Sequence, residues 1–258
     1  MSRDSTAKVL TVALLLCVVC SILVSAAAVL LSDRQERNKV EEKKRNILIA
    51  AGLFQPELSV EEQFGRIEPR IVDLQSGSFS EEFDPATFDS RSAANDPATR
   101  TRIAADQDLA GIKVHSRYQD VYLVREAGRL QQVVLPVYGK GLWSTMYGFI
   151  ALDRDLRTVR GFAFYEHGET PGLGGEIDNP AWKKLWRGKK VYDRDGTLRI
   201  EVLKGQVDRD SADAIYQVDG LAGATLTARG VSNLLRYWLG ENGYRPFLEL
   251  LKGEGDDL

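Results

Sequence analysis

The sequence has almost none of the residues that bind metals through sulfur or imidazole. Its only cysteines, Cys17 and Cys20, lie inside a long apolar run, and its only histidines, His115 and His167, are far apart. This composition excludes a disulfide and a cysteine-ligated iron–sulfur or zinc site from the rest of the chain, and it argues against a histidine metal centre. We therefore expect no metal site, and any redox chemistry would need an organic cofactor.

The chain also lacks an excess of basic charge. It has 34 Lys and Arg against 37 Asp and Glu, which gives a net charge of −3. We therefore predict no nucleic-acid partner, because nucleic-acid binding depends on a basic surface. With 258 residues and 43% hydrophobic content, the chain is long enough for one sizeable domain with attachments.

A charge-free apolar run from Val9 to Leu31 follows a short tail, residues 1–8. A helix of this length crosses the ~30 Å hydrocarbon layer of a bilayer, so we predict one transmembrane helix. A cleaved signal peptide is the alternative, since Ala26-Ala27-Ala28 resembles a cleavage site. The uncleaved helix is favoured because Val29-Leu30-Leu31 continue the apolar run past that point.

Residues 32–102 are predicted to form a juxtamembrane segment of helix and loop. Six basic residues early in it outnumber Arg3 and Lys8 before the span, and charge bias alone would therefore place the main domain in the cytoplasm. That rule is weakest when a long folded domain follows. The expected parts are a charged helix at Ser32–Leu53, a short helix after the capping-box pair Ser59 and Glu62, and a surface loop at Ser76–Arg102.

Residues 103–258 are predicted to form the main domain. Short turns link two pairs of strand-like segments, which implies antiparallel pairing and an α+β fold in which helices flank the sheet. The first pair is Val121–Val124 and Leu130–Leu135, joined by Glu126-Ala127-Gly128; the second is Gly148–Leu152 and Val159–Tyr165, joined by Asp153–Arg157. Further expected elements are a helix from Asn179-Pro180 through Trp186, strands at Arg199–Leu203 and Ile215–Val218, and a last helical turn or two at Pro246–Leu251.

A glycine- and threonine-rich turn runs into an amphipathic helix within Asp219–Leu239. Thr225 or Thr227 sits at the helix start, where unpaired N–H groups and the helix dipole suit a phosphate, and Gly220 and Gly223 leave room for a ligand. The alternative is an N-cap threonine, which contributes ~1 kcal/mol. A Walker loop is excluded because no Gly-Lys-Ser/Thr follows the glycines.

Two glycine-bounded loops are candidates for holding a flat ring. Glu166–Glu176 must turn sharply, and its backbone amides and Leu173 would face the ring. In Gly139–Gly148, the large side chains of Trp143, Met146 and Tyr147 are more often core or interface residues than ring contacts. The predicted cofactor-binding residues are Thr225, Asp219, Gly223, Ala224, Leu226 and Thr227 in the turn, and Glu169, Thr170, Leu173, Gly174, Trp143 and Ser144 in the loops.

The turn resembles the flavinylation motif Asp-x-x-(Ser/Thr)-Gly-Ala-Thr-x-Thr of FMN-binding domains, with Ala222 in place of the usual Ser or Thr. The segments GKGLWSTMYG, HGETPGLGGEI and DGLAGATLT, in this order behind one N-terminal span, are similar to the NqrC family of the sodium-translocating NADH:quinone reductases. The resemblance covers Met1 to Leu251. The related RnfG family shares the ETPGLG-type loop and the Gly-Ala-Thr turn.

This resemblance implies a function. FMN would be joined through a phosphoester to Thr225 by a flavin transferase that uses FAD. The protein would be an electron carrier, without a catalytic acid or base, within a six-subunit translocase that passes electrons from NADH to ubiquinone and exports Na+. It would be a single-pass protein of the bacterial inner membrane, with its FMN domain in the periplasm.

Other classes stay open from the sequence alone. A flavinylated RnfG protein of an Rnf-type ferredoxin:NAD oxidoreductase would share the chemistry but differ in its donor. A membrane-anchored FMN module for redox sensing would lack reductase partners. The last alternative is a membrane-anchored domain without flavin.

Overall fold

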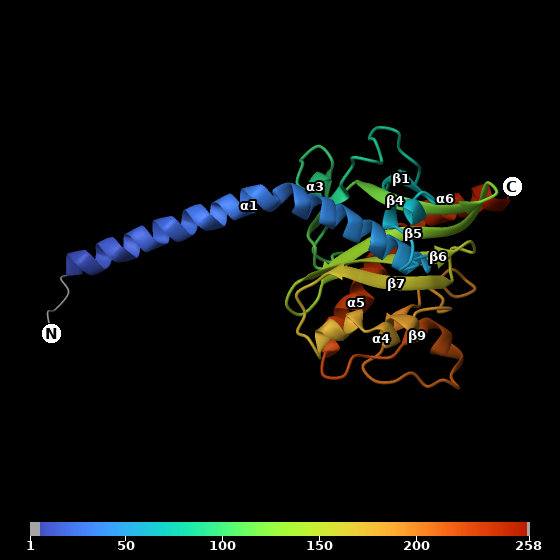
Figure 1. The fold of residues 1–258 in the computed structure, drawn as a ribbon. Helices are drawn as coiled ribbons and strands as arrows, with labels where there is room; N and C mark the ends of the chain where they lie inside the picture. The colour runs from blue at the N-terminus through green and yellow to red at the C-terminus, as the bar shows by residue number, and fades with distance from the viewer. Residues whose placement is uncertain (1–5, 257–258) are drawn as a thin grey trace. The chain divides into compact units, whose positions relative to one another are not determined.

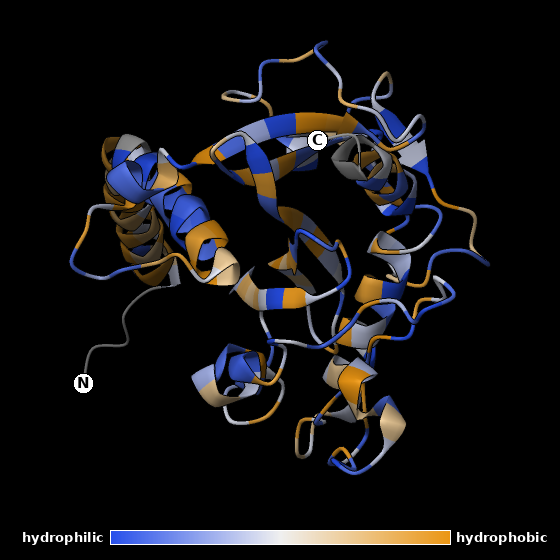
Figure 2. Ribbon diagram, turned by 90° about the vertical axis from the view of Figure 1, so that its right-hand side faces the viewer, coloured by the Kyte–Doolittle hydropathy of each residue, from blue (hydrophilic) through white to orange (hydrophobic). Residues whose placement is uncertain are grey.

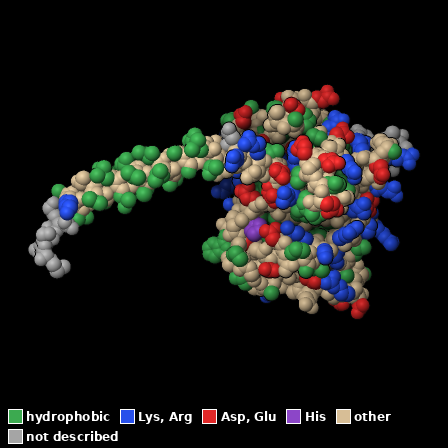
Figure 3. Space-filling view, viewed as in Figure 1, with side chains coloured by type: hydrophobic (Ala, Val, Ile, Leu, Met, Phe, Trp, Pro, Cys, Tyr) green, Lys and Arg blue, Asp and Glu red, His purple; other side chains and the backbone are tan. Residues whose placement is uncertain are grey.

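The computed structural model describes residues 6–256. Residues 1–5, including Arg3 of the predicted tail, lie outside the described residues. Helix α1 (Thr6–Ala51) contains a stretch, Thr6–Ser32, that is long and apolar enough to cross a membrane. Green side chains dominate this stretch in Figure 3, while α1 as a whole carries both orange and blue turns in Figure 2. The predictions of one apolar N-terminal helix and a charged helical extension are therefore confirmed.

Residues up to Lys43 and residues from Lys44 onward form two compact units. The second unit is built on a five-stranded sheet in the order β1-β4-β5-β6-β7, with every neighbouring pair antiparallel (Figure 1). The strands are β1 (Ile67–Asp73), β4 (Tyr118–Glu126), β5 (Arg129–Lys140), β6 (Thr145–Asp153) and β7 (Val159–Glu166). The predicted α+β fold with an antiparallel sheet is confirmed, and β1 shows that the segment before residue 103 also supplies a strand.

The β4–β5 turn shows why the predicted hairpin forms. Ala127 and Gly128 have φ angles of 49° and 81°, and two successive left-handed residues match the twist of a tight hairpin. Glycine adopts this conformation without steric penalty, which explains its place in the turn.

Both faces of the sheet are buried, since successive residues of β5 point to opposite sides and belong to two different apolar clusters. Val133 and Leu135 belong to one apolar cluster, which includes residues of α5 (Thr225–Trp238) and α6 (Arg245–Asp256). Val134 belongs to a second cluster, which includes Ile47 and Leu48 from the end of α1. α2 (Val60–Phe64) contributes Val60 to this second cluster.

The remaining elements refine several predictions. Ser59 accepts a hydrogen bond from Glu62 N (3.2 Å), and Asn179 accepts one from Ala181 N (2.9 Å), so both predicted helix caps are confirmed. β8 (Glu201–Val202) and β9 (Gln217–Val218) pair in parallel, and the 3-10 helix η2 (Ala212–Tyr216) lies between them in the chain. The other elements are α3 (Ser90–Ala93), β2 (Arg100–Arg102), β3 (Val114–Ser116), η1 (Gly174–Asp178) and α4 (Pro180–Lys184).

Three predicted segments differ from the structure. The Ser76–Arg102 loop contains α3 and β2, and α4 ends at Lys184 instead of Trp186. The loop predicted at Gly139–Gly148 is mostly strand, because β5 extends to Lys140 and β6 starts at Thr145. Only residues 141–144 form the tip of this hairpin.

Helix α5 crosses close to that hairpin tip. A Cβ atom at Gly230 would lie 2.4 Å from the carbonyl oxygen of Lys140, so a larger residue would push the helix away from the end of β5. Trp238 Nε1 donates to the carbonyl of Tyr138 (2.7 Å), and the Tyr244 hydroxyl donates to that of Pro136 (2.9 Å). Gly230 therefore sets the middle of α5 against the end of β5, and the bonds from Trp238 and Tyr244 hold the end of α5 and the segment after it on the same strand.

Candidate functional site

The first turn of α5 presents a threonine hydroxyl that the fold does not use. The N-cap is Ala224, which has no side chain able to cap the helix, and Thr225 is the first helical residue. The alternative in which a threonine caps this helix is therefore wrong. The Thr225 side chain is half-buried, and among residues 6–256 its hydroxyl has no hydrogen-bond partner.

Asp219, the first residue of the motif, holds the turn in place. Its carboxylate accepts hydrogen bonds from Val207 N (2.8 Å) and Arg209 Nη2 (2.5 Å), and its backbone oxygen accepts one from Trp182 Nε1 (2.9 Å). A Cβ at Gly220 would lie 2.3 Å from the carbonyl oxygen of Leu203, so this glycine is explained by close backbone packing. The direct ligand contact predicted for Asp219 stays a prediction.

Glu169 joins the three segments that the sequence singled out. Its side chain is 5% exposed, and its Oε1 accepts from the backbone N–H groups of Trp143 (2.9 Å) and Ser144 (3.2 Å). Its Oε2 accepts from Leu142 N (3.2 Å) and from the Thr227 hydroxyl (2.5 Å). The hairpin tip, the loop after β7 and helix α5 therefore meet at one carboxylate, which we call the Glu169 clasp.

The clasp holds an ionised carboxylate. Burial alone would raise the pKa of Glu169, but the hydrogen bonds from Thr227, Trp143, Leu142 and Ser144 together outweigh burial and lower the pKa. Thr227 is only 1% exposed. The Thr227 hydroxyl is thus already occupied by its hydrogen bond to the Glu169 carboxylate.

Glycines in two of the loops make room for the carboxylate. A Cβ at Gly174 would lie 2.6 Å from Thr227 Oγ1 and 2.9 Å from Glu169 Oε2, and one at Gly141 would lie 2.5 Å from Glu169 Oε1. Ser144 adds a further link, since its hydroxyl oxygen accepts from Gly168 N (2.6 Å).

Large apolar side chains remain exposed around the threonine turn. Leu142 is 46% exposed, Trp143 70%, Leu173 45% and Leu226 51%. Leu173 touches the turn itself, because a Cβ at Gly223 would lie 3.0 Å from Leu173 Cδ2. Exposed apolar side chains of this kind suit contact with a flat cofactor ring.

The structure separates the three large side chains of the predicted Gly139–Gly148 loop. Met146 is fully buried in the core, as expected, whereas Trp143 stands exposed at the hairpin tip. Tyr147 is half-buried and stacks on Tyr138, with ring centroids 5.4 Å apart. Thr170 is exposed, and its carbonyl oxygen accepts from Leu173 N (3.1 Å) and Gly175 N (2.9 Å), which shapes the turn that presents Leu173.

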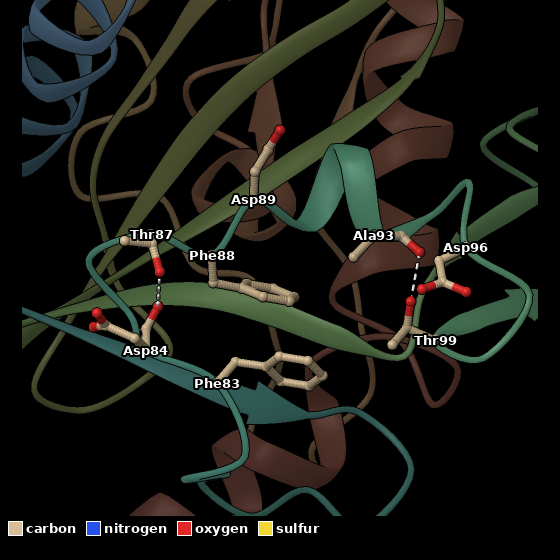
Figure 4. A pocket seen from close by; sticks show the side chains of 8 residues that line it. All are labelled: Phe83, Asp84, Thr87, Phe88, Asp89, Ala93, Asp96 and Thr99. Carbon is tan, nitrogen blue, oxygen red and sulfur yellow. Dashed lines mark hydrogen bonds between the residues drawn. The ribbon is translucent and has the colours of Figure 1, made fainter.

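A pocket of about 260 Å³ lies in a different segment (Figure 4). It is lined by Phe83, Asp84, Thr87, Phe88, Asp89, Ala93, Asp96 and Thr99. None of these residues belongs to the hairpin tip, the loop after β7 or the threonine turn.

Comparisons with known proteins agree with this location. The sequence profile of the FMN-binding domain family matches residues 141–240. The chain is 52% identical to NqrC of the Na(+)-translocating NADH-quinone reductase of Pseudomonas aeruginosa, over 98% of this chain and 99% of that protein. It is 48% identical to the corresponding protein of Yersinia pestis, over 97% of this chain and 95% of that protein.

Solved structures show the same fold. The crystal structure of NqrC from Shewanella oneidensis superposes with a TM-score of 0.77 at 34% identity, covering 85% of this chain and 99% of that one. The crystal structure of the corresponding reductase protein from Parabacteroides distasonis gives a TM-score of 0.65 at 26% identity, covering 84% of this chain and 96% of that one.

Proposed function

Because the chain belongs to the NqrC family of the Na(+)-translocating NADH-quinone reductases, we propose that it carries FMN joined through a phosphoester to the Thr225 hydroxyl. Family membership makes the protein an FMN-binding subunit of that oxidoreductase, working beside other subunits. The single observation that carries the attachment is the half-buried Thr225 hydroxyl, which neither caps α5 nor bonds to any described residue.

The start of α5 suits the phosphate of this cofactor. The first helical N–H groups have no partners within the helix, and the positive end of the helix dipole favours an anion there. No acidic residue lies in the first turn of α5, so no side chain there repels a phosphate. The exposed side chains of Leu173 and Trp143 would shield the ring from water.

The bound flavin supplies electron transfer, and the protein supplies its place. We propose no general acid or base in this chain. A covalent link keeps the carrier in position without a repeated entropic cost of binding. Thr225 would hold the phosphate, while the Glu169 clasp holds the loops beside it.

The direction of transfer is part of the proposal. Electrons from NADH would reach this flavin from other subunits and pass on toward ubiquinone, coupled to Na+ export. The span Thr6–Ser32 contains no Asp or Glu, so Na+ passage is assigned to other subunits of a six-subunit assembly. A separate flavin transferase would form the bond from the Thr225 oxygen to the FMN phosphorus of FAD, with AMP as leaving group.

The attachment is tested by the mass of one peptide. Trypsin releases Asp210–Arg229, which contains both Thr225 and Thr227. In cells that contain the flavin transferase, we expect this peptide to carry the mass of FMN less water, with fragment ions that place it on Thr225. An unmodified peptide from such cells would refute the attachment, and a modified Thr227 would move it.

Membrane orientation is tested separately. We propose a single-pass protein of the inner membrane with the FMN domain in the periplasm. A protease added to intact spheroplasts should then degrade residues 44–258. Protection of the domain would instead support the orientation given by the basic residues after the span.

A further inference from the structure

The tip of the β5–β6 hairpin has an anion-binding arrangement. Gly141 N donates to the carbonyl of Ser144 (2.8 Å), which closes the turn, and the next three N–H groups, at residues 142–144, all donate to Glu169. Successive N–H groups that converge in this way form a concave nest for an anion. Here the anion is part of the protein, so these three amides are not available to a cofactor.

The two threonines at the start of α5 face different surroundings. Residues two positions apart on an α-helix are separated by about 200° around its axis. The Thr225 side chain is half-buried and its hydroxyl has no partner among residues 6–256, whereas Thr227 is 1% exposed and donates to Glu169 at 2.5 Å. The second threonine of the motif is therefore tied to the hairpin tip through the clasp.

We propose that Glu169 is a positioning residue, which fixes the Trp143 tip against the start of α5 and thereby sets where the flavin ring lies. The claim that Glu169 sets the position of the flavin ring rests on the proposed attachment at Thr225. The claim that Glu169 holds the tip does not. The Glu169 clasp joins the tip to α5 without any cofactor, so the tip is already in place beside the start of α5 before FMN is added. Glu169 acts through the tip and not by contact with the ring.

Trp143 reports on the tip directly. The chain has four tryptophans. Trp143 is 70% exposed, whereas Trp182, Trp186 and Trp238 are 6%, 0% and 0% exposed. The fluorescence difference between any variant and its Trp143→Phe counterpart therefore isolates the tip.

The experiment uses Glu169→Gln with Glu176→Gln as the matched control. Glu176 lies in the same loop and bonds at the surface to Asn179 (2.7 Å), so its substitution makes the same chemical change away from the clasp. In full-length protein made in cells without the flavin transferase, so that no flavin is attached, we expect Glu169→Gln to lower the fluorescence anisotropy of Trp143. In flavin-loaded protein we expect it to shift the midpoint potential of the flavin while the peptide mass still shows attachment. Glu176→Gln should change neither.

Thr227→Val serves as a second variant because it removes one of the four hydrogen bonds at similar side-chain volume. It should produce smaller changes in Trp143 anisotropy and flavin potential, in the same direction as Glu169→Gln. If Glu169→Gln does not accumulate, Thr227→Val tests whether the clasp holds the tip. Wild-type anisotropy and potential in the folded variants would overturn the proposal. An unmodified wild-type peptide would refute the attachment alone, since the anisotropy comparison still decides whether Glu169 holds the tip.

Discussion

The pocket at residues 83–99 and the threonine turn differ in what their polar groups are doing. In the pocket, Asp84 accepts from Ala86 N (2.9 Å), Asp96 accepts from Ala98 N (2.9 Å), and the Thr99 hydroxyl donates to the Ala93 carbonyl (2.7 Å). These groups are occupied by their own turns, and Figure 4 shows two bonds of this kind as dashed lines. At the threonine turn, the Thr225 hydroxyl has no partner among residues 6–256.

If Thr225 carries the cofactor as proposed, the cofactor does not need a hollow to hold it. A freely binding ligand depends on a concave site that buries most of its surface. A covalent bond replaces that requirement, since the cofactor cannot dissociate and its local concentration stays high. The Thr225 hydroxyl, in a turn that Leu173 contacts, is therefore a better candidate site than the pocket.

The largest effect is expected on covalent flavin, when Thr225 of the turn is compared with Thr99 of the pocket. Thr225→Val removes the oxygen that would bond to phosphorus, so in-gel flavin fluorescence after denaturation should disappear while the protein still accumulates. Thr99→Val removes a hydroxyl of the pocket and should leave the fluorescence unchanged. Fluorescence that survives in Thr225→Val would place the attachment elsewhere and break the comparison.

The next effect concerns carboxylates in the two regions. Glu169→Ala leaves the buried Thr227 hydroxyl and the partly buried N–H groups of the tip without their acceptor, and we expect a loss of about 3 kcal/mol in the free energy of unfolding. Asp96→Ala removes one exposed turn bond and should lower that free energy by about 0.5–1 kcal/mol. Urea unfolding measures both, and equal losses would show that the clasp contributes no more than a surface turn.

Acid should affect the clasp in a predictable direction. The pKa of Glu169 is lower in the folded protein than its ordinary value, so its contribution to stability is present above the ordinary pKa and is lost as pH falls through the folded pKa. Wild type should therefore lose more stability than Glu169→Gln when the pH falls from about 5 to 3, since an ordinary Glu titrates near 4.3. Parallel unfolding curves for the two proteins across that range would contradict the lowered pKa.

The sequence predicts what depends on local pattern. The apolar span, the Ala127-Gly128 turn, the Asn179 cap and the helix start at Thr225 all follow from spacing within a few residues, and the structure confirms each of them. Antiparallel pairing of β4 to β7 follows from their short connections.

Contacts between distant residues are not visible in the sequence. Glu169 and Thr227 meet across 58 positions, so the sequence gives no sign that the carboxylate holds loops together. Met146 lies in β6 and is buried, whereas Trp143 lies before the strand and is exposed, and the sequence did not show where the strand begins. The bond between Asp219 and Arg209, which the sequence did not predict, also depends on tertiary packing.

The smallest effect should separate contact with the ring from attachment. Leu173 is 45% exposed and lies against the turn at Gly223, so Leu173→Ala removes apolar cover beside Thr225 without touching the hydroxyl or the clasp. The covalent flavin should remain, but its midpoint potential should shift, because a more hydrated ring stabilises its charged forms differently. Phe88→Ala in the pocket provides the matched loss of an apolar side chain and should leave the potential unchanged. Identical redox titrations of Leu173→Ala and wild type would remove Leu173 from the surroundings of the ring, even if Thr225 carries the flavin.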